Sequence, residues 1–271
     1  MTGHTETRRP GFMDGRLRLG IFSAFLLCAG IWLAVLCRGL PPQGWLDALL
    51  LLLALAATVA GLTRDLPLQN ALMAIALAAF VSGIIQIVNA KTGIPFGALS
   101  YTESSGARIF GLVPWPVPLL CAVAVLNSRG AARLILRRWP NLPSRGLWTI
   151  GLASLLAVAT DLSLEPFAVE VRRFWSWRTT PKQFAWHTVP WPNYLAGLIV
   201  TFLILVLAAP WLIDKRPVKN PPPNPYPFWL WLAVNLLLAV ANASHGLWDS
   251  AAFGFLSSLA VGILAWRSAR A

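Results

Sequence analysis

Two carboxyl groups near the end of an apolar run are the residues of this chain best suited to chemistry. Asp161 lies within the run 147–164 and Glu165 directly follows it, in a sequence with only ten Asp and Glu residues. On a continuous helix, residues four apart share one face. A carboxylate near bilayer hydrocarbon is costly and usually faces a polar interior. Because burial and a like-charged neighbour favour the neutral acid, such a pair can supply both a general acid and a general base.

Simpler roles for the two carboxyl groups are a polar contact between helices or an ion pair with Arg172 or Arg173. Pro166 follows Glu165 directly and predicts that the helix ends there. Asp161 is then the deeper of the two acids and Glu165 the one closer to the membrane surface.

The composition predicts that these residues lie in a polytopic membrane protein. Hydrophobic residues make up 57% of the chain and charged residues 12%, and the mean hydropathy is +0.64. Apolar runs long enough to cross a bilayer as helices recur along the chain. We predict an all-α bundle of seven or eight spans at 19–37, 45–62, 70–89, 109–127, 147–164, 192–213, 228–245 and 250–266. The last two are short and could form one hairpin.

The distribution of basic residues predicts how this bundle lies in the membrane. With an inner N-terminus, inner segments carry 15 Lys and Arg residues and outer segments carry 7. This bias is the positive-inside pattern. The net charge of +12 therefore indicates orientation and contact with anionic lipid rather than binding of nucleic acid. We predict an integral protein of the bacterial cytoplasmic membrane with both termini cytoplasmic.

The chain reads as one transmembrane domain, 17–271, after a polar cytoplasmic tail, 1–16. The Pro-rich segment 214–227 is predicted to be an extended inner spacer. Two longer loops, 90–108 and 165–191, fall on the outer side. This topology gathers polar side chains near one membrane face: Asn89, Tyr101, Glu103, Asp161, Glu165, His187, Asn193, His245 and Asp249.

Other candidates have competing interpretations. His187 is either a site residue or an exposed loop histidine, and His245 with Asp249 is either a site or a pair at a helix end. The segment 93–97, with Gly at both ends around Pro95, predicts a tight turn that allows close backbone approach. The aromatic cluster in 174–186 either anchors its loop among lipid headgroups or forms the wall of a slot for a flat apolar ligand.

The sequence gives little support for metals or nucleotides. Cys28, Cys37 and Cys121 show no paired spacing, and the His and acidic residues have no metal-ligand spacing such as HExxH. Phosphate-binding glycine motifs and the nucleophile elbow are also missing from the sequence. We therefore predict no metal site, and the missing motifs argue against nucleotide-driven, nicotinamide or α/β-hydrolase chemistry.

Four segments in order carry a resemblance to a known family: KTGIPFGALSYT (91–102), GLVPWPVPLL (111–120), ATDLSLEPFAV (159–169) and VPWPNYLAGLIV (189–200). Together they resemble the carotenoid biosynthesis membrane proteins that include the bisanhydrobacterioruberin and γ-carotene 1′-hydratases. The resemblance implies a cofactor-independent hydratase that adds water to the C1′–C2′ double bond of an acyclic carotenoid or related polyprenoid lipid. Other enzymes of that pathway become candidate partners.

The resemblance implies that Asp161 and Glu165 are catalytic, with Glu165 in place of the family's second Asp. We predict substrate-binding roles for Tyr101, Phe96, Trp191, Asn193 and His187. The chain departs from the family pattern at four positions: Gln86 (an acid is expected), Asn89 (Gly), Leu99 (Tyr) and Cys121 (Trp). The alternative is a membrane protein without enzymatic activity, either a small-solute transporter or an assembly partner, although no internal repeat supports a transporter.

Overall fold

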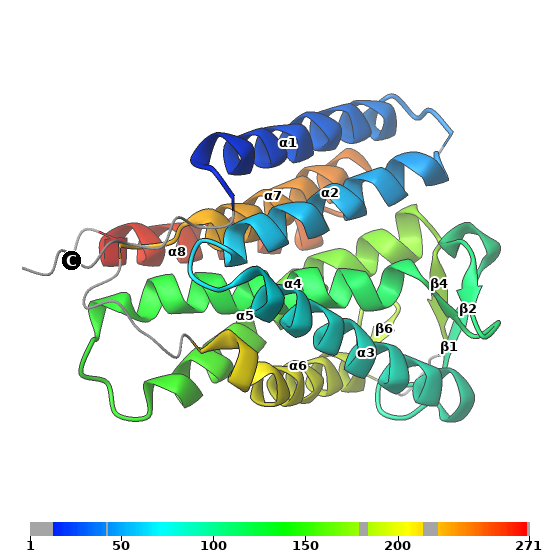
Figure 1. Ribbon diagram of the computed structural model, residues 1–271. Coiled ribbons are helices and arrows are strands. Elements are labelled where there is room, and N and C mark those ends of the chain that lie inside the picture. Colours follow the sequence, from blue (N-terminus) through cyan, green and yellow to red (C-terminus); the bar gives the residue numbers. More distant parts are fainter. Residues whose placement is uncertain (1–12, 42, 179–183, 214–221, 270–271) are drawn as a thin grey trace, which may run out of the picture.

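The fold was analysed in a computed structural model, which describes residues 13–41, 43–178, 184–213 and 222–269. Eight long helices run through this part of the chain (Figure 1). They are α1 (Gly15–Cys37), α2 (Gly44–Leu62), α3 (Leu68–Thr92), α4 (Pro116–Ile135), α5 (Arg145–Pro166), α6 (Trp191–Leu212), α7 (Tyr226–Ser244) and α8 (Trp248–Ala269). All eight are long and apolar enough to cross a membrane, which confirms the predicted polytopic helical fold.

Helices α4 and α5 lie at the centre of the bundle. Helix α4 packs against α2, α3, α5, α7 and α8, whereas α1 packs mainly against α2 and α7. Helices α3, α4, α5 and α6 also pack in a ring, because α3 contacts α4 and α6, and α5 contacts α4 and α6. Small side chains at the contacts, such as Ala74, Ala78, Ala122 and Ala153, are fully buried and let the backbones approach closely.

Short elements cover one end of the bundle, at the right in Figure 1. Strand β1 (Leu99–Tyr101) pairs with β4 (Trp175–Trp177), β2 (Arg108–Ile109) with β3 (Val113–Pro114), and β5 (Ala185–Trp186) with β6 (Val189–Pro190), all antiparallel. The 3₁₀ turn η1 (Glu103–Ser105) follows β1, and η2 (Leu136–Arg138) extends α4 at the opposite end. We call residues 93–115, 172–178 and 184–190 the cap. Hydropathy did not predict its strands, which have only two or three residues each.

The predicted span 109–127 was wrong in its boundaries. Residues 108–114 form the β2–β3 hairpin, and the amide of Trp115 donates to the carbonyl of Ala107 at 3.0 Å. Helix α4 begins only at Pro116, whose fixed φ and missing N–H suit the first position of a helix. The span is therefore displaced toward the C-terminus and continues through η2 to Arg138.

The prediction that the helix ends at Pro166 was also wrong. Helix α5 passes directly into a π-helical turn, η3 (Phe167–Val171), and the amide of Arg172 donates to the carbonyl of Phe167 at 3.0 Å. A proline ring inside a helix displaces a backbone hydrogen bond, and a wider π turn is one way to accommodate it. As a result, the helix carrying the two acids leads without a break into the cap.

The last two helices are two separate spans that form an antiparallel hairpin through a turn at 245–247. Polar side chains join the hairpin to α5. Asn235 donates to the hydroxyl of Thr160 at 3.1 Å, and Asn242 donates to the carbonyl of Ser163 at 2.8 Å. Such hydrogen bonds between helices stabilise membrane bundles.

Parts of two predicted segments lie outside the described residues. These are most of the polar tail, in 1–12, and most of the Pro-rich spacer, in 214–221. Where the structure describes these segments, helix α1 already begins at Gly15 and α7 at Tyr226, so both predicted segments extended slightly too far.

Close packing at Gly130 gives a testable prediction of stability. A Cβ atom at this position of α4 would lie 2.2 Å from Cβ of Pro227 on α7. We expect Gly130→Ala to destabilise the protein by about 1–3 kcal/mol through overpacking. Thermal unfolding in detergent is the measurement, and Gly151→Ala is the control because its new Cβ would meet no atom within 4 Å. Equal melting temperatures for the two variants would contradict this packing.

Candidate active site

A cavity of about 850 Å³, including its open mouth, lies inside the ring of α3, α4, α5 and α6, below the cap. The wall is mostly apolar, with polar groups concentrated toward the cap. It is lined by Ser82, Gln86, Phe96, Leu99, Tyr101, Val117, Leu120, Cys121, Ala124, Val125, Ala157, Val158, Asp161, Leu164, Glu165, Trp175, Trp177, Asn193, Gly197, Val200 and Thr201.

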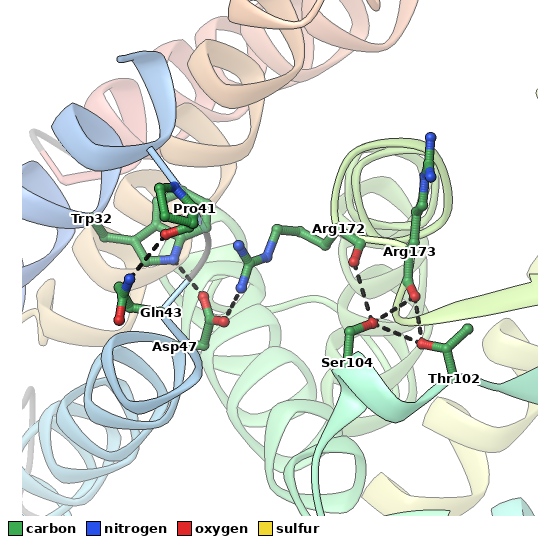
Figure 2. Close-up of polar contacts among 8 residues, drawn as sticks. All are labelled: Trp32, Pro41, Gln43, Asp47, Thr102, Ser104, Arg172 and Arg173. Carbon is green, nitrogen blue, oxygen red and sulfur yellow. Dashed lines mark hydrogen bonds and ion pairs between the residues drawn. The ribbon is translucent and has the colours of Figure 1, made fainter. Parts of the chain in front are cut away.

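Both predicted acids line this cavity. Asp161 and Glu165 lie one helical turn apart on α5, about 6 Å along the helix axis. Neither has the ion pair with an arginine that the simpler interpretation proposed. Arg172 instead binds Asp47 of α2 (Figure 2), and the carbonyl of Arg173 accepts hydrogen bonds from Thr102 and Ser104. The described hydrogen bonds of the two acids come from neutral donors.

Glu165 is held by two tryptophans of strand β4. The indole N–H groups of Trp175 and Trp177 both donate to Oε2 of Glu165, each at 2.9 Å. Successive residues of a strand point to opposite faces, so Trp175 and Trp177, two positions apart, share the inner face of β4 while Ser176 between them is exposed. An indole N–H can only donate, and donors on a carboxylate oxygen favour the charged form. This environment favours Glu165 as the anion of the pair.

Asp161 has a weaker set of donors. The amide of Asn193 donates to Oδ2 of Asp161 at 3.3 Å, and Gly197, one turn further along α6, leaves open space beside the same oxygen. Val158 and Cys121 line the cavity nearby. With one long hydrogen bond and apolar neighbours, Asp161 is the acid better suited to carrying a proton.

The predicted tight turn places Phe96 in the cavity wall. Gly93 ends α3 in the left-handed conformation, and Gly97 has a φ of 119°. The side chain of Asn89 bridges the turn: its Oδ1 accepts from the amide of Phe96 at 2.8 Å, and its Nδ2 donates to the carbonyl of Gly97 at 3.1 Å. A Cβ on Gly97 would meet the ring of Trp177 at an ordinary contact distance of 3.5 Å, so it is the backbone conformation rather than the space that requires glycine here.

Tyr101 completes the polar part of the cavity. Its hydroxyl donates to Oε1 of Gln86 at 3.1 Å, and its ring meets Trp175 edge to face with centroids 6.2 Å apart. Burial, followed by the nearby charge of Glu165, raises the pKa of the Tyr101 phenol above its ordinary value. Tyr101 therefore stays protonated, so it can donate a hydrogen bond but cannot act as a base.

The structure brings together five of the seven predicted site residues: Asp161, Glu165, Tyr101, Phe96 and Asn193. Trp191 and His187 lie outside the cavity lining. Trp191 stacks on Phe184 with ring centroids 5.4 Å apart. The ring nitrogens of His187 lie 2.8 Å from Glu170 and 3.2 Å from Asp249. The predicted pair of His245 with Asp249 was wrong, because Asp249 contacts His187 and the ring of His245 lies against the carbonyl of Ala241 instead.

Several lining residues were not singled out from the sequence. Gly197 and Thr201 of α6 follow Asn193 at intervals of four, so they share its face of the helix; that spacing was the available signal. Of the aromatic cluster, Trp175 and Trp177 form part of the cavity wall, as the slot interpretation proposed for the cluster. Their hydrogen bonds to Glu165 had no signal in the sequence. Among the described residues, no group of three or more His, Cys, Asp or Glu side chains is arranged to bind a metal ion.

Comparisons with known proteins show the family of this chain. Residues 46–261 match the sequence family described as "Carotenoid biosynthesis protein", and this region includes every residue that lines the cavity. The bisanhydrobacterioruberin hydratase of Haloarcula japonica is 28% identical over 207 residues, covering 76% of this chain and 67% of the relative. No solved structure matches the chain significantly. Since the family match extends from the second helix into the eighth, the chain belongs to the carotenoid biosynthesis protein family.

Proposed function

We propose that this protein hydrates the C1′–C2′ double bond at the ψ-end of an acyclic carotenoid or a related polyprenoid lipid. The observation that carries the proposal is the pair of acids in one largely apolar cavity, with two close donors on Glu165 and one distant donor on Asp161. The family and the hydratase relative support a carotenoid as the substrate. Hydration of an alkene needs one group that gives a proton and another that takes one.

The reaction proceeds in two steps in this cavity. The carboxyl group of Asp161 transfers its proton to C2′, the double bond is consumed, and a tertiary cation forms at C1′. Water then bonds to C1′ while the carboxylate of Glu165 accepts one of its protons, which gives a tertiary alcohol. Afterwards Glu165 carries the proton that Asp161 has lost, and transfer between them through water resets the site. Every atom comes from the lipid and one water, so no cofactor is required.

The aromatic residues around the acids suit the cationic intermediate. The rings of Phe96, Tyr101, Trp175 and Trp177 all line the cavity near Glu165. The faces of aromatic rings attract positive charge, and the attraction is stronger where water is excluded. These rings can stabilise the cation without offering it a competing nucleophile.

The positions of the acids also orient the lipid. Glu165 lies closer to the cap, and Asp161 lies one turn deeper in the bundle. When C2′ faces Asp161 and C1′ faces the water at Glu165, the two terminal methyl groups point toward the cap. The rest of the chain then runs toward the apolar residues Ala157, Val158 and Val200.

We also propose that the cap faces the outside of the bacterial cytoplasmic membrane, with both termini in the cytoplasm. The bias of basic residues toward the opposite loops supports this orientation. Reporter fusions in the loop 139–144 and at the C-terminus test it, since both should report a cytoplasmic location. A periplasmic location for either would contradict the orientation and would leave the chemistry unaffected.

Pigment analysis tests the proposed activity. The chain is expressed in a host that accumulates lycopene, in medium enriched in H₂¹⁸O, and the extracted pigments are separated by liquid chromatography and mass spectrometry. We expect a more polar carotenoid that is heavier by one water and carries ¹⁸O. If the protein is inserted in the membrane but gives no such product with lycopene or with longer acyclic carotenoids, the proposed function is wrong.

A further inference from the structure

The two indole donors of Glu165 lie on a strand that needs support from elsewhere. Strand β4 has three residues and pairs only with the three residues of β1 among the described strands. A two-stranded sheet of this size has little stability of its own in water. Both Trp175 and Trp177 nevertheless reach the same oxygen at 2.9 Å, so the position of β4 must be set by other contacts.

Backbone contacts hold the residues that lead into β4. The amide of Phe174 donates to the carbonyl of Ala168 at 2.9 Å, which ties the start of the strand back to η3. From the β1 side, the hydroxyls of Thr102 and Ser104 donate to the carbonyl of Arg173 at 2.5 and 2.8 Å (Figure 2). Arg173 has a φ of 52°, a left-handed conformation that is uncommon outside glycine and persists where surroundings enforce it.

The side chain of Arg172 connects this segment to the first two helices. It extends away from Arg173 to bind Oδ2 of Asp47, in the first turn of α2 (Figure 2). The other oxygen of Asp47 accepts the indole N–H of Trp32, on α1, at 2.7 Å. The guanidinium centre also lies 5.1 Å from the ring centroid of Phe174, the residue next to β4. Helices α1 and α2 supply no residue to the cavity lining. The contacts of Arg172 nevertheless connect both helices to the segment that carries Trp175 and Trp177.

Stability alone does not account for this ion pair. The side chain of Arg172 is 6% exposed and that of Asp47 is 23% exposed, so the pair is largely removed from water, and Nε of Arg172 has no hydrogen-bond partner among the described residues. Removing two charges from water costs about as much as their attraction returns, so apolar residues can often replace a buried pair without loss of stability. The best-attested use of such pairs is to select one arrangement over its alternatives.

We propose that Arg172 and Asp47 are positioning residues that set β4 so that Trp175 and Trp177 both donate to Glu165. This inference rests on the proposed function for its effect on rate, while its geometric part can be measured without activity. The ion pair fixes Arg172, and the two indoles follow it by three and five positions along the chain. The hydrogen bonds of Glu165 then depend on a contact made by α2, which packs outside the ring of helices around the cavity.

The test uses Asp47→Asn, which keeps an acceptor for Trp32 but removes the charge facing Arg172. The protein is labelled with 5-fluorotryptophan, and the ¹⁹F resonances of Trp175 and Trp177 are assigned with Trp→Phe variants. We expect both resonances to move in Asp47→Asn. Since a small misplacement of reacting groups can cost as much as a hundredfold in rate, we expect kcat for hydration to fall about tenfold or more, with little change in KM.

The pH–rate profile separates positioning from a general loss of structure. Because indole donors favour the charged carboxylate, loosening them should move the acidic limb of the profile to higher pH, as Trp175→Phe should. The double variant Asp47→Asn/Arg172→Met removes both charges and keeps an acceptor for the indole of Trp32. We expect it to be as thermally stable as the wild type while keeping the displaced resonances and the altered profile.

Arg133→Gln is the matched control. It breaks a different and more exposed ion pair, in which Arg133 lies 3.3 Å from Asp65 at the other end of the bundle. It should leave the resonances and the profile unchanged. If Asp47→Asn and the double variant both give the resonances and profile of the wild type, the positioning role is wrong. If wild-type protein hydrates nothing, the proposed function fails, and the ¹⁹F spectra alone decide whether the ion pair sets the position of β4.

Discussion

Asp161→Asn should remove hydration almost completely while leaving a folded protein in the membrane. The amide is nearly the same size as the carboxyl group, but it cannot give the proton that C2′ requires. General acid catalysis contributes about 10²–10⁴-fold to rates. No other acidic residue among those described lies at the depth of Asp161 in the cavity, so none can replace it as the proton donor. Formation of the ¹⁸O-labelled water adduct per inserted protein is the measurement.

Asp65→Asn is the control for that loss. The Asp65→Asn substitution makes the same chemical change, but at the other end of the bundle, where Asp65 pairs with Arg133. This variant should insert and hydrate as the wild type does. Full activity in Asp161→Asn would remove the acid from the mechanism, and equal losses in both variants would indicate a fault of insertion rather than of chemistry.

Glu165→Gln should block the reaction at a different step. Asp161 can still protonate C2′, but no carboxylate remains to take a proton from water. The cation then returns its proton to Asp161. In D₂O, we therefore expect recovered lycopene to contain deuterium at the ends of the chain, although the water adduct falls by about 10²–10⁴-fold. Mass spectrometry of the recovered substrate measures the exchange.

The pattern across the two acid variants assigns their roles. Asp161→Asn should show neither exchange nor hydration, because the first proton transfer is lost. If Glu165→Gln shows no exchange while Asp161→Asn does, the roles are reversed, and the two indole donors must then serve the proton donor. Trp177→Phe should retain measurable hydration, since Trp175 still donates to the same oxygen.

The helices could be predicted from the sequence because apolar length is a local property. Each of the eight predicted runs overlaps one long helix, and the shared face of Asp161 and Glu165 follows from helical spacing alone. Errors arose where short-range structure replaced a helix, as in the β2–β3 hairpin before Pro116, or prolonged one, as in the π turn after Pro166. Apolar composition does not distinguish a buried hairpin from the first turns of a span.

The hydrogen bonds of the site could not be predicted in the same way. Trp175 reaches Glu165 because β4 pairs with β1, so Tyr101 lies opposite Trp175 across a sequence separation of more than seventy residues. The spacing of Trp175 and Trp177 places them on one face of a strand, but nothing local to the segment 174–186 predicts that strand or its pairing with β1. Nor does it predict that Phe184 stacks on Trp191. His187 gave an equally weak signal, because the partners that hold it, Glu170 and Asp249, come from two different elements.

The pairing of β1 with β4 has a consequence for how the protein is made. Helices of a membrane protein can each form and insert before they associate, but β1 and β4 meet only after α3, α4 and α5 are all in place. Contacts between distant segments form slowly because their loops must close first. Newly synthesised chains should therefore pass through a stage with every helix inserted and Glu165 still without its indole donors. Competence for catalysis should then lag behind membrane insertion, and the β1–β4 ladder should be the last part of the site to assemble.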